Sequence, residues 1–206
     1  MDLSELKIVQ WNAQSLNSNR HIFMDFLYNQ NIHIAIISET WLKPEQNFKI
    51  KHYNIERNDT GNKHNGVAII IHNSIAYNKV NTYFDSSLQN ICIRIKIDNK
   101  EISIVSFYSP LKCNPEFKKH KFDFLIKSIP EPFIFAGDFN AHHTSWGCGS
   151  DSIRGRDVLD VIDDNNLVLT NNLHGLNNIL NKYICILINI FLLKYSEYGF
   201  CLFILL

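Results

Sequence analysis

Polar side chains stand at the ends of four apolar runs in this 206-residue sequence. They are Asn12, Glu39, Tyr108, and the pair Asp138 and Asn140. In layered α/β folds, functional sites gather where strands end, because a rigid sheet can aim neighbouring side chains at one point. If the four runs are strands, we expect these five side chains to meet in a single site.

The five residue types suit the hydrolysis of a phosphate diester. That reaction needs a hard divalent cation on oxygen ligands, donors for the phosphate oxygens, and a base for water. The Glu39 carboxylate suits Mg²⁺ or Mn²⁺, and an asparagine supplies both a carbonyl oxygen for a metal and an amide donor for phosphate. The Tyr108 hydroxyl can donate to developing negative charge. Asp138 can orient or deprotonate the attacking water.

Each of these residues taken alone has an ordinary structural explanation. An asparagine at a strand end is usually a turn residue or a helix cap, and Asp138 after Gly137 is consistent with simple turn chemistry. Glu39 could be a surface carboxylate, and Tyr108 could be a core aromatic whose hydroxyl reaches water. The chemical interpretation therefore rests on the whole set.

The hydrophobic pattern predicts strands and helices in alternation along the chain. Apolar runs predict strands at 6–12, 34–37, 66–71, 91–97, 102–108, 133–136 and 167–170. Apolar residues at helical spacing predict amphipathic helices near 22–27, 122–129 and 158–162. The 91–97 and 102–108 runs flank a short polar turn and are typical of a hairpin. This order favours a layered α/β sandwich with mixed sheets.

The bulk composition fits one domain with a sizeable core. The 20 basic and 20 acidic residues cancel, which argues weakly against a tight, nonspecific DNA binder but leaves room for local basic patches. The five cysteines are widely spread and show no zinc or redox spacing, and the N-terminus shows no signal-peptide pattern. We therefore expect an intracellular protein, nuclear or cytoplasmic, with reduced thiols.

Four motifs follow one another in order: 10–15 (QWNAQS), 37–41 (ISETW), 107–110 (FYSP) and 137–143 (GDFNAHH). As an ordered set they resemble the DNase-I-like superfamily of endonucleases, exonucleases and phosphatases. The last motif, with Trp146-Gly147 and Arg154-Gly155-Arg156 after it, is most similar to the endonuclease domain of jockey-type non-LTR retrotransposon proteins, which are RNA-directed DNA polymerases. The resemblance implies a four-layer αββα sandwich with two mixed β-sheets.

The resemblance also implies a role for each residue of the predicted site. It places Asn12 and Glu39 at the metal. It places Tyr108 against the scissile phosphate, and Asp138 and Asn140 around the attacking water and the phosphate.

Four basic side chains would contact the DNA substrate by the same resemblance: His142, His143, Arg154 and Arg156. Adjacent histidines on an extended backbone point opposite ways, so one of the pair could simply be packed. The arginines could pair with phosphates, or they could be solvated charges near the start of the following helix. Trp146 could stack on a base, but we expect it to pack under its own loop.

The sequence departs from the family pattern after residue 172. The family closes with a further strand, an aspartate-bearing hairpin and a Ser-Asp-His motif, and this sequence contains no Ser-Asp-His. His174 lies too early to replace that histidine. We therefore expect an incomplete family domain at 1–172, with the last strands missing, and an apolar tail at 173–206 outside it.

The tail contains two apolar runs, 184–193 and 200–206. A membrane-spanning helix needs about 20 mostly apolar residues, which neither run reaches. Joining them would bury Lys194 and Glu197, at about 2.5–3.5 kcal/mol each. Insertion into a membrane is therefore the less favoured interpretation.

These observations together predict a magnesium-dependent endonuclease domain that, in the intact parent protein, nicks target DNA to prime reverse transcription. Because the family's histidine is missing, we expect this chain to be inactive or nearly so. Two alternatives stay open: another superfamily phosphatase acting on inositol or lipid phosphates, and a non-enzymatic remnant with a membrane-associating tail. No stable protein partner is implied.

Overall fold

The computed structural model describes residues 6–61, 64–97, 100–111, 116–169 and 189–194. Its strands form two sheets. The first has the order β1-β2-β4-β3 and contains β1 (Ile8–Asn12), β2 (Ile34–Ser38), β3 (Tyr53–Asn58) and β4 (Val67–His72). The second has the order β5-β6-β7-β8-β10-β9 and contains β5 (Tyr77–Val80), β6 (Gln89–Ile97), β7 (Lys100–Tyr108), β8 (Phe133–Asp138), β9 (Val168–Leu169) and β10 (Asn189–Lys194). The helices are α1 (Arg20–Asn29), α2 (Lys119–Lys127), the single 3₁₀ turn η1 (Thr144–Trp146) and α3 (Ile153–Asp164).

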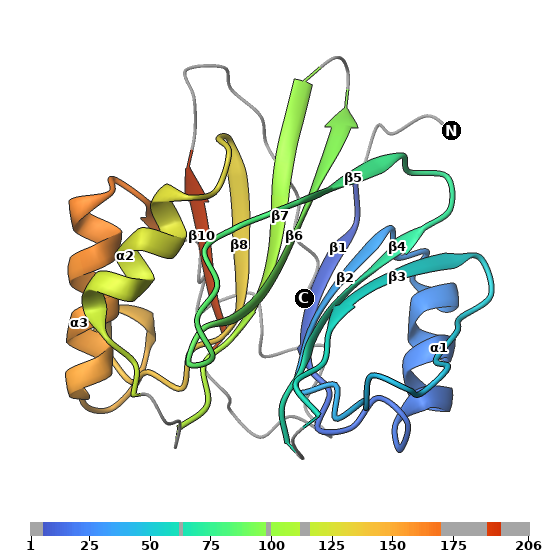
Figure 1. Ribbon diagram of the computed structural model, residues 1–206, viewed down its shortest axis with the longest axis horizontal. Helices are drawn as coiled ribbons and strands as arrows, with labels where there is room; N and C mark the ends of the chain where they lie inside the picture. The colour runs from blue at the N-terminus through green and yellow to red at the C-terminus, as the bar shows by residue number, and fades with distance from the viewer. Residues whose placement is uncertain (1–5, 62–63, 98–99, 112–115, 170–188, 195–206) are drawn as a thin grey trace.

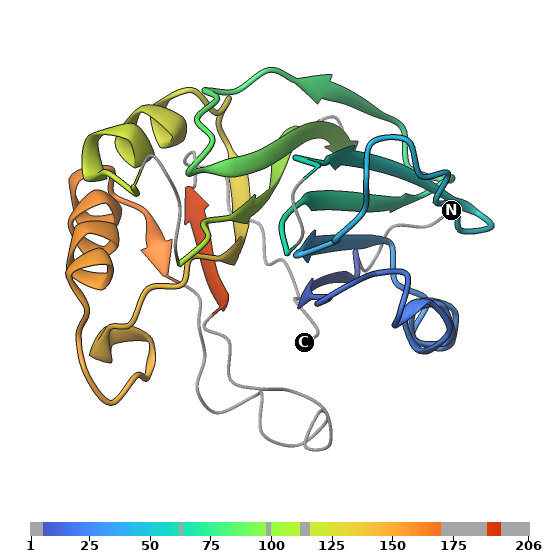
Figure 2. The same ribbon diagram turned by 60° about the horizontal axis from the view of Figure 1, so that its bottom comes forward.

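The helices cover the outer faces of the two sheets, which gives four layers. Helix α1 packs its buried Phe23 and Leu27 on the four-stranded sheet, on one side of the molecule. Helices α2 and α3 cover the six-stranded sheet on the other side, as the two views show (Figures 1 and 2). Both sheets mix parallel and antiparallel pairs. The predicted four-layer αββα sandwich is confirmed.

Isoleucines fill the space between the two sheets. Strand β2 is buried along its whole length because its inward residues, Ile34 and Ile36, meet this inner core. Its outward residues, Ala35 and Ile37, meet the core under α1. A strand buried on both faces reads as a continuous apolar run, which is why the sequence pattern predicts it.

Strand direction brings the predicted site residues to one end of the sandwich. Strands β1 and β2 run parallel, with Asn12 beside Ser38, so Asn12 and Glu39 leave the first sheet together. Strands β7 and β8 also run parallel, and Tyr108 is the register partner of Asp138 at the end of the second sheet. These ends lie at the lower side of Figure 1.

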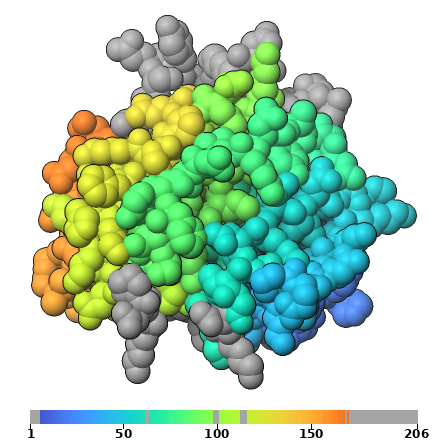
Figure 3. All heavy atoms as spheres, viewed as in Figure 1, coloured from blue at the N-terminus to red at the C-terminus, as the bar shows by residue number. Residues whose placement is uncertain are grey.

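Strands β3 and β5 were not predicted from the sequence. Both are edge strands of mainly polar composition (YNIERN and YNKV), and their apolar residues, such as Tyr53 and Ile55 of β3, are too few to form a distinct apolar run. The chain from β5 into β6, in green, lies at the surface between the yellow α2 region and the cyan β3 region (Figure 3).

Strand β10 lies within the segment 173–206 that we expected to be an appended tail. It pairs antiparallel with β8, and Asn189 is the register partner of Asp138. The boundary at 172 and the second apolar run lie outside the described residues. Within the described part of the chain, no helix is long and apolar enough to cross a membrane.

Candidate active site

The amide of Asn12 joins the two sheets at their shared end. Its Nδ2 donates to Glu39 Oε1 and to Asp138 Oδ2, at 2.8 Å in each case. Its Oδ1 accepts from the backbone N–H of Gln14 at 3.2 Å. The nitrogen of Asn12 therefore faces the two carboxylates, and its oxygen is used within its own turn.

Glu39 and Asn140 both have backbone conformations that side chains rarely adopt. Their φ angles are 54° and 48°, and Trp41, with φ 52°, shares this feature. Such a conformation persists only where the surrounding structure enforces it. Trp41 Nε1 donates to Glu39 Oε2 at 3.2 Å, so it orients the carboxylate. This role of Trp41 was not predicted, although Trp41 closes the 37–41 motif two residues after Glu39.

Asp138 is fully buried at the end of β8. Its Oδ1 accepts from the backbone N–H of Asn140 at 2.9 Å. Burial raises the pKa of Asp138 above its usual range, and the nearby charge of Glu39 acts in the same direction. The hydrogen bonds from Asn140 and Asn12 and the charge of Arg154 oppose that rise in pKa.

Tyr108 is also buried, and its hydroxyl interacts with the side chains of Glu39 and Asn140. Burial raises the pKa of Tyr108, and the charges of Glu39 and Asp138 raise it further. The phenol is therefore protonated at neutral pH and can act as a hydrogen-bond donor. Hydrogen bonds thus connect all five residues predicted to form one site.

Arg154, on α3, links the two loops that follow Tyr108 and Asp138. Its Nη1 donates to the carbonyl oxygens of Ser109, Pro110 and Phe139 at 3.0–3.2 Å. The guanidinium also lies 5.3 Å from the centre of the Phe117 ring. These contacts with backbone carbonyls fix the residues that follow Tyr108 and Asp138. The predicted contact of Arg154 with DNA phosphate stays a prediction.

The two adjacent histidines point in opposite ways, as an extended backbone requires. His142 is exposed, whereas His143 is buried and packs against Trp146, with tilted rings whose centres lie 5.1 Å apart. His143 Nδ1 accepts from Ser145 N at 3.0 Å, and its Nε2 lies 3.6 Å from Asp151. His143 is thus a packed residue of the loop, and His142 faces solvent.

Trp146 packs under the loop as predicted, and its Nε1 donates to the Ala141 carbonyl at 2.9 Å.

Arg156 is exposed on α3, one turn from Ser152, which caps that helix. Gly155 between the arginines is required by space, because a Cβ there would lie 1.9 Å from the His142 carbonyl oxygen.

The oxygen ligands available at the site fit a hard cation that keeps most of its bound waters. Glu39 and Asp138 place two carboxylates around one amide, and the positive charge of Arg154 lies near Asp138. Among the described residues, no group of three or more histidine, cysteine or acidic side chains could hold a metal. One or two carboxylates with several waters is the usual protein environment of Mg²⁺, whereas a zinc site needs more protein ligands.

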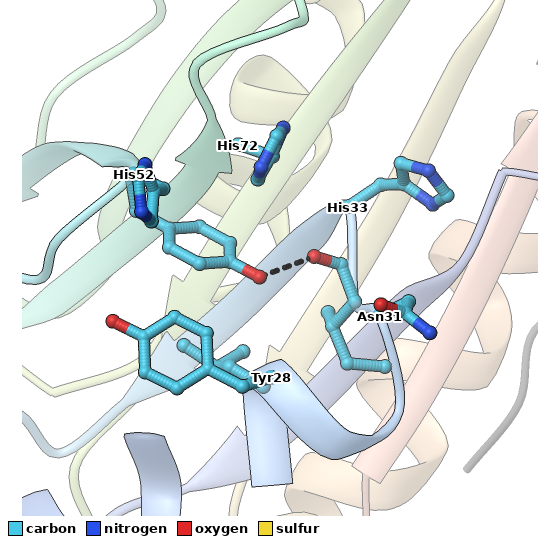
Figure 4. Close-up of a pocket in the computed structure, with 8 residues that line it drawn as sticks. Tyr28, Asn31, His33, His52 and His72 are labelled. Carbon is cyan, nitrogen blue, oxygen red and sulfur yellow. Dashed lines mark hydrogen bonds between the residues drawn. The ribbon is translucent and has the colours of Figure 1, made fainter. Parts of the chain in front are cut away.

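A small cavity of about 130 Å³ lies at the opposite end of the four-stranded sheet (Figure 4). It is lined by Leu27, Tyr28, Asn31, Ile32, His33, His52, Tyr53 and His72. The Tyr53 hydroxyl donates to the Ile32 carbonyl at 2.7 Å. His33 precedes β2, whereas Glu39 follows its other end, so this cavity is separate from the candidate active site.

Comparison with known proteins supports the interpretation drawn from the motifs. The model of the Endonuclease/Exonuclease/phosphatase family matches residues 9–178, which include the whole site. The chain belongs to this family. The resemblance stated from the motifs is confirmed.

The curated relatives of this endonuclease/exonuclease/phosphatase domain include proteins of mobile elements. The chain is 28% identical over 155 residues to a probable RNA-directed DNA polymerase from transposon X-element of Drosophila melanogaster. It is 23% identical over 159 residues to the RNA-directed DNA polymerase from mobile element jockey of the same species. These alignments cover 73% and 76% of the chain but only 17% of each relative, so the chain spans a small part of their length.

Solved structures with the same fold include an endonuclease domain and a protein complexed with a DNA product. The endonuclease domain of TRAS1, a telomere-specific non-LTR retrotransposon, matches with a TM-score of 0.69 at 19% identity, covering 90% of this chain and 83% of that one. D. rerio TDP2, complexed with a single-strand DNA product, matches with a TM-score of 0.57 at 13% identity, covering 95% and 86%.

Proposed function

We propose that this domain is a divalent-metal-dependent phosphodiesterase that nicks DNA, as the endonuclease of a non-LTR retrotransposon protein. The observation that carries the proposal is the Asn12 amide, which holds Glu39 and Asp138 together across the two sheets. The mobile-element relatives and the TRAS1 domain support DNA as the substrate. In the parent protein, the nick would prime reverse transcription.

Glu39, with the Asn12 amide beside it, would hold Mg²⁺ or Mn²⁺. The cation would supply Lewis-acid polarisation of a phosphate oxygen. Asn12 would also hold the two carboxylates together and in a fixed orientation, because each accepts one of its amide hydrogens. Trp41 would fix the second oxygen of Glu39.

The remaining residues would handle the phosphate and the water. Asp138 would orient the attacking water or accept its proton, since a buried carboxyl with a raised pKa is a better base than an exposed one. Tyr108, protonated and buried, would donate to the phosphate oxygen that gains negative charge. His142, Arg156 and the other basic residues predicted from the motif would contact the DNA backbone only where they are exposed.

A plasmid-nicking assay tests the proposal. We expect slow conversion of supercoiled plasmid to the nicked form in Mg²⁺, lost in Glu39→Ala and retained in Glu45→Ala, which removes an exposed glutamate nearby. Persistence of the same nicking in Glu39→Ala would assign it to a contaminant or to another site.

The same preparation separates the alternatives. Release of inorganic phosphate from phosphoinositide vesicles, lost in Glu39→Ala and faster than plasmid nicking, would make the domain a lipid phosphatase. Absence of both activities together with absence of Glu39-dependent Mn²⁺ binding would make it a non-enzymatic remnant.

A further inference from the structure

A layer of small and polar side chains separates the isoleucine core from the candidate active site. Along three inward strand faces, an isoleucine is followed two residues later by a polar residue. These polar residues are Gln10 after Ile8, Ser38 after Ile36, and Ser106 after Ile104. Their exposed fractions are 5%, 0% and 0%. We refer to Gln10, Ser38 and Ser106 as the polar layer.

Within the described residues, one side chain of the polar layer forms a hydrogen bond and two do not. Ser106 Oγ donates to the Ile37 carbonyl at 2.8 Å, which ties the two sheets together. Gln10 Nε2, Gln10 Oε1 and Ser38 Oγ have no hydrogen-bonding partner within the described part of the chain. A buried polar atom without a partner is costly, and such atoms usually bind an ordered water.

The strand register places these unpaired atoms next to Asn12 and Glu39, on the side of the candidate active site that faces the isoleucine core. Gln10 lies beside Ile36 and Ser38 lies beside Asn12, so Gln10 and Ser38 are diagonal neighbours on one inner face. Gln10 precedes Asn12 by two residues on the same face of β1, and Ser38 is bonded to Glu39 through the backbone. Together they offer the two to four polar contacts that a buried water needs.

We propose that Gln10 and Ser38 hold an ordered water behind Asn12 and act through it as positioning residues for Asn12 and Glu39. This inference rests on the proposed function, since it concerns the cation affinity of the same site. Groups that orient a metal ligand without touching the metal typically change metal affinity 10–100-fold. The water would fix the strand ends from which both side chains project.

Methionine replaces the length of glutamine without its hydrogen bonds, so Gln10→Met is the first test variant, and Ser38→Ala is the second. The matched control is Gln89→Met. Gln89 is equally buried, but its Oε1 already accepts from Gly66 N at 2.8 Å. The measurements are Mn²⁺ affinity by electron paramagnetic resonance, Tm without added cation, and a crystal structure of the parent chain.

We expect Gln10→Met and Ser38→Ala each to weaken Mn²⁺ binding about 10-fold or more without raising Tm. Gln89→Met should lower Tm, because it leaves the Gly66 N–H without its acceptor, and should keep the parent's Mn²⁺ affinity. The crystal structure should show a water within hydrogen-bonding distance of Gln10 and Ser38.

A rise in Tm for Gln10→Met, with unchanged Mn²⁺ affinity, would show a dry, unpaired amide and overturn the inference. A parent chain whose Mn²⁺ binding does not depend on Glu39 would instead contradict the proposed function. In that case the Tm of Gln10→Met and the crystallographic water still decide whether the polar layer holds water.

Discussion

Asp138 shows the conflict between stability and function that a buried carboxylate creates. Burial raises its pKa in the folded chain above the value of about 3.9 of an unfolded aspartate. The folded state therefore binds this proton more tightly, and the stability that Asp138 contributes is present below about pH 3.9 and is lost as the pH rises through the folded pKa. The charged form is nevertheless the one that the proposed chemistry uses.

The raised pKa of Asp138 predicts how Asp138→Asn changes the pH dependence of stability. Relative to the parent, the free energy of unfolding of Asp138→Asn should rise between pH 4 and pH 8, because the variant has no buried carboxyl to ionise. Urea denaturation across this pH range measures the difference. Asp163→Asn, which removes an exposed carboxylate of α3, is the control. A difference that is constant or falls with pH would contradict the raised pKa.

At this scale the sequence predicts which residues meet but not how they are oriented. Asn12, Glu39 and Asp138 could be predicted as neighbours because each follows an apolar strand. The direction of the Asn12 amide and the role of Trp41 could not, because both depend on contacts between chain segments in space. The motif pattern includes Arg154, but only the fold shows that its guanidinium faces backbone carbonyls.

The pairing of β7 with β8 explains why a glycine precedes Asp138. A Cβ on Gly137 would lie 1.9 Å from the Phe107 carbonyl oxygen, and backbone cannot move aside as a flexible side chain can. We expect Gly137→Ala to lower the free energy of unfolding by about 3 kcal/mol or more, through displacement of the strand that carries Asp138. Gly149→Ala, where a Cβ meets nothing within 4 Å, should change it by no more than about 0.5 kcal/mol. Equal chemical-denaturation midpoints for the two variants would refute this account.

Helix α3 contributes to the site through Arg154. Because the guanidinium satisfies carbonyls of two loops, Arg154→Met should cost about 2 kcal/mol of stability and reduce any nicking activity. Arg156→Met removes an exposed charge from the same helix and should change stability by no more than about 0.5 kcal/mol. Thermal denaturation with a nicking assay measures both. If Arg154 acted on DNA phosphate instead, its loss would weaken DNA binding and leave stability unchanged.

The sequence pattern predicts a strand or helix correctly where the element is buried on both faces or has a periodic apolar face. It does not predict the edge strands β3 and β5. The run 34–37 predicts β2 because both of its faces are covered. Strands β3 and β5 are short and mainly polar, so their few apolar residues do not form a run that predicts a strand. Their pairing with β4 and β6 is decided by tertiary contacts, which override weak local preference.

The residues of the candidate active site come from both sheets of the molecule. The first sheet supplies Asn12 and Glu39, and the second supplies Tyr108 and Asp138, so neither sheet holds the site alone. The isoleucine core between them fixes the distance across which the Asn12 amide can reach both carboxylates. Loosening this core should therefore affect activity before the chain unfolds.

At this scale we predict that the 206-residue chain nicks DNA slowly. The described residues supply the proposed cation site and a phenol, but His143 is packed against Trp146 and His142 is exposed, and neither hydrogen-bonds to Glu39, Tyr108 or Asp138 in that part of the chain. A positioned acid or base typically contributes about 10²–10⁴-fold to rate. We therefore expect plasmid nicking about 10²–10⁴-fold slower than that of the TRAS1 endonuclease domain assayed in parallel, while Mn²⁺ binding persists. A comparable rate that is lost in both Glu39→Ala and His142→Ala would show that the exposed histidine reaches the substrate and serves as the base.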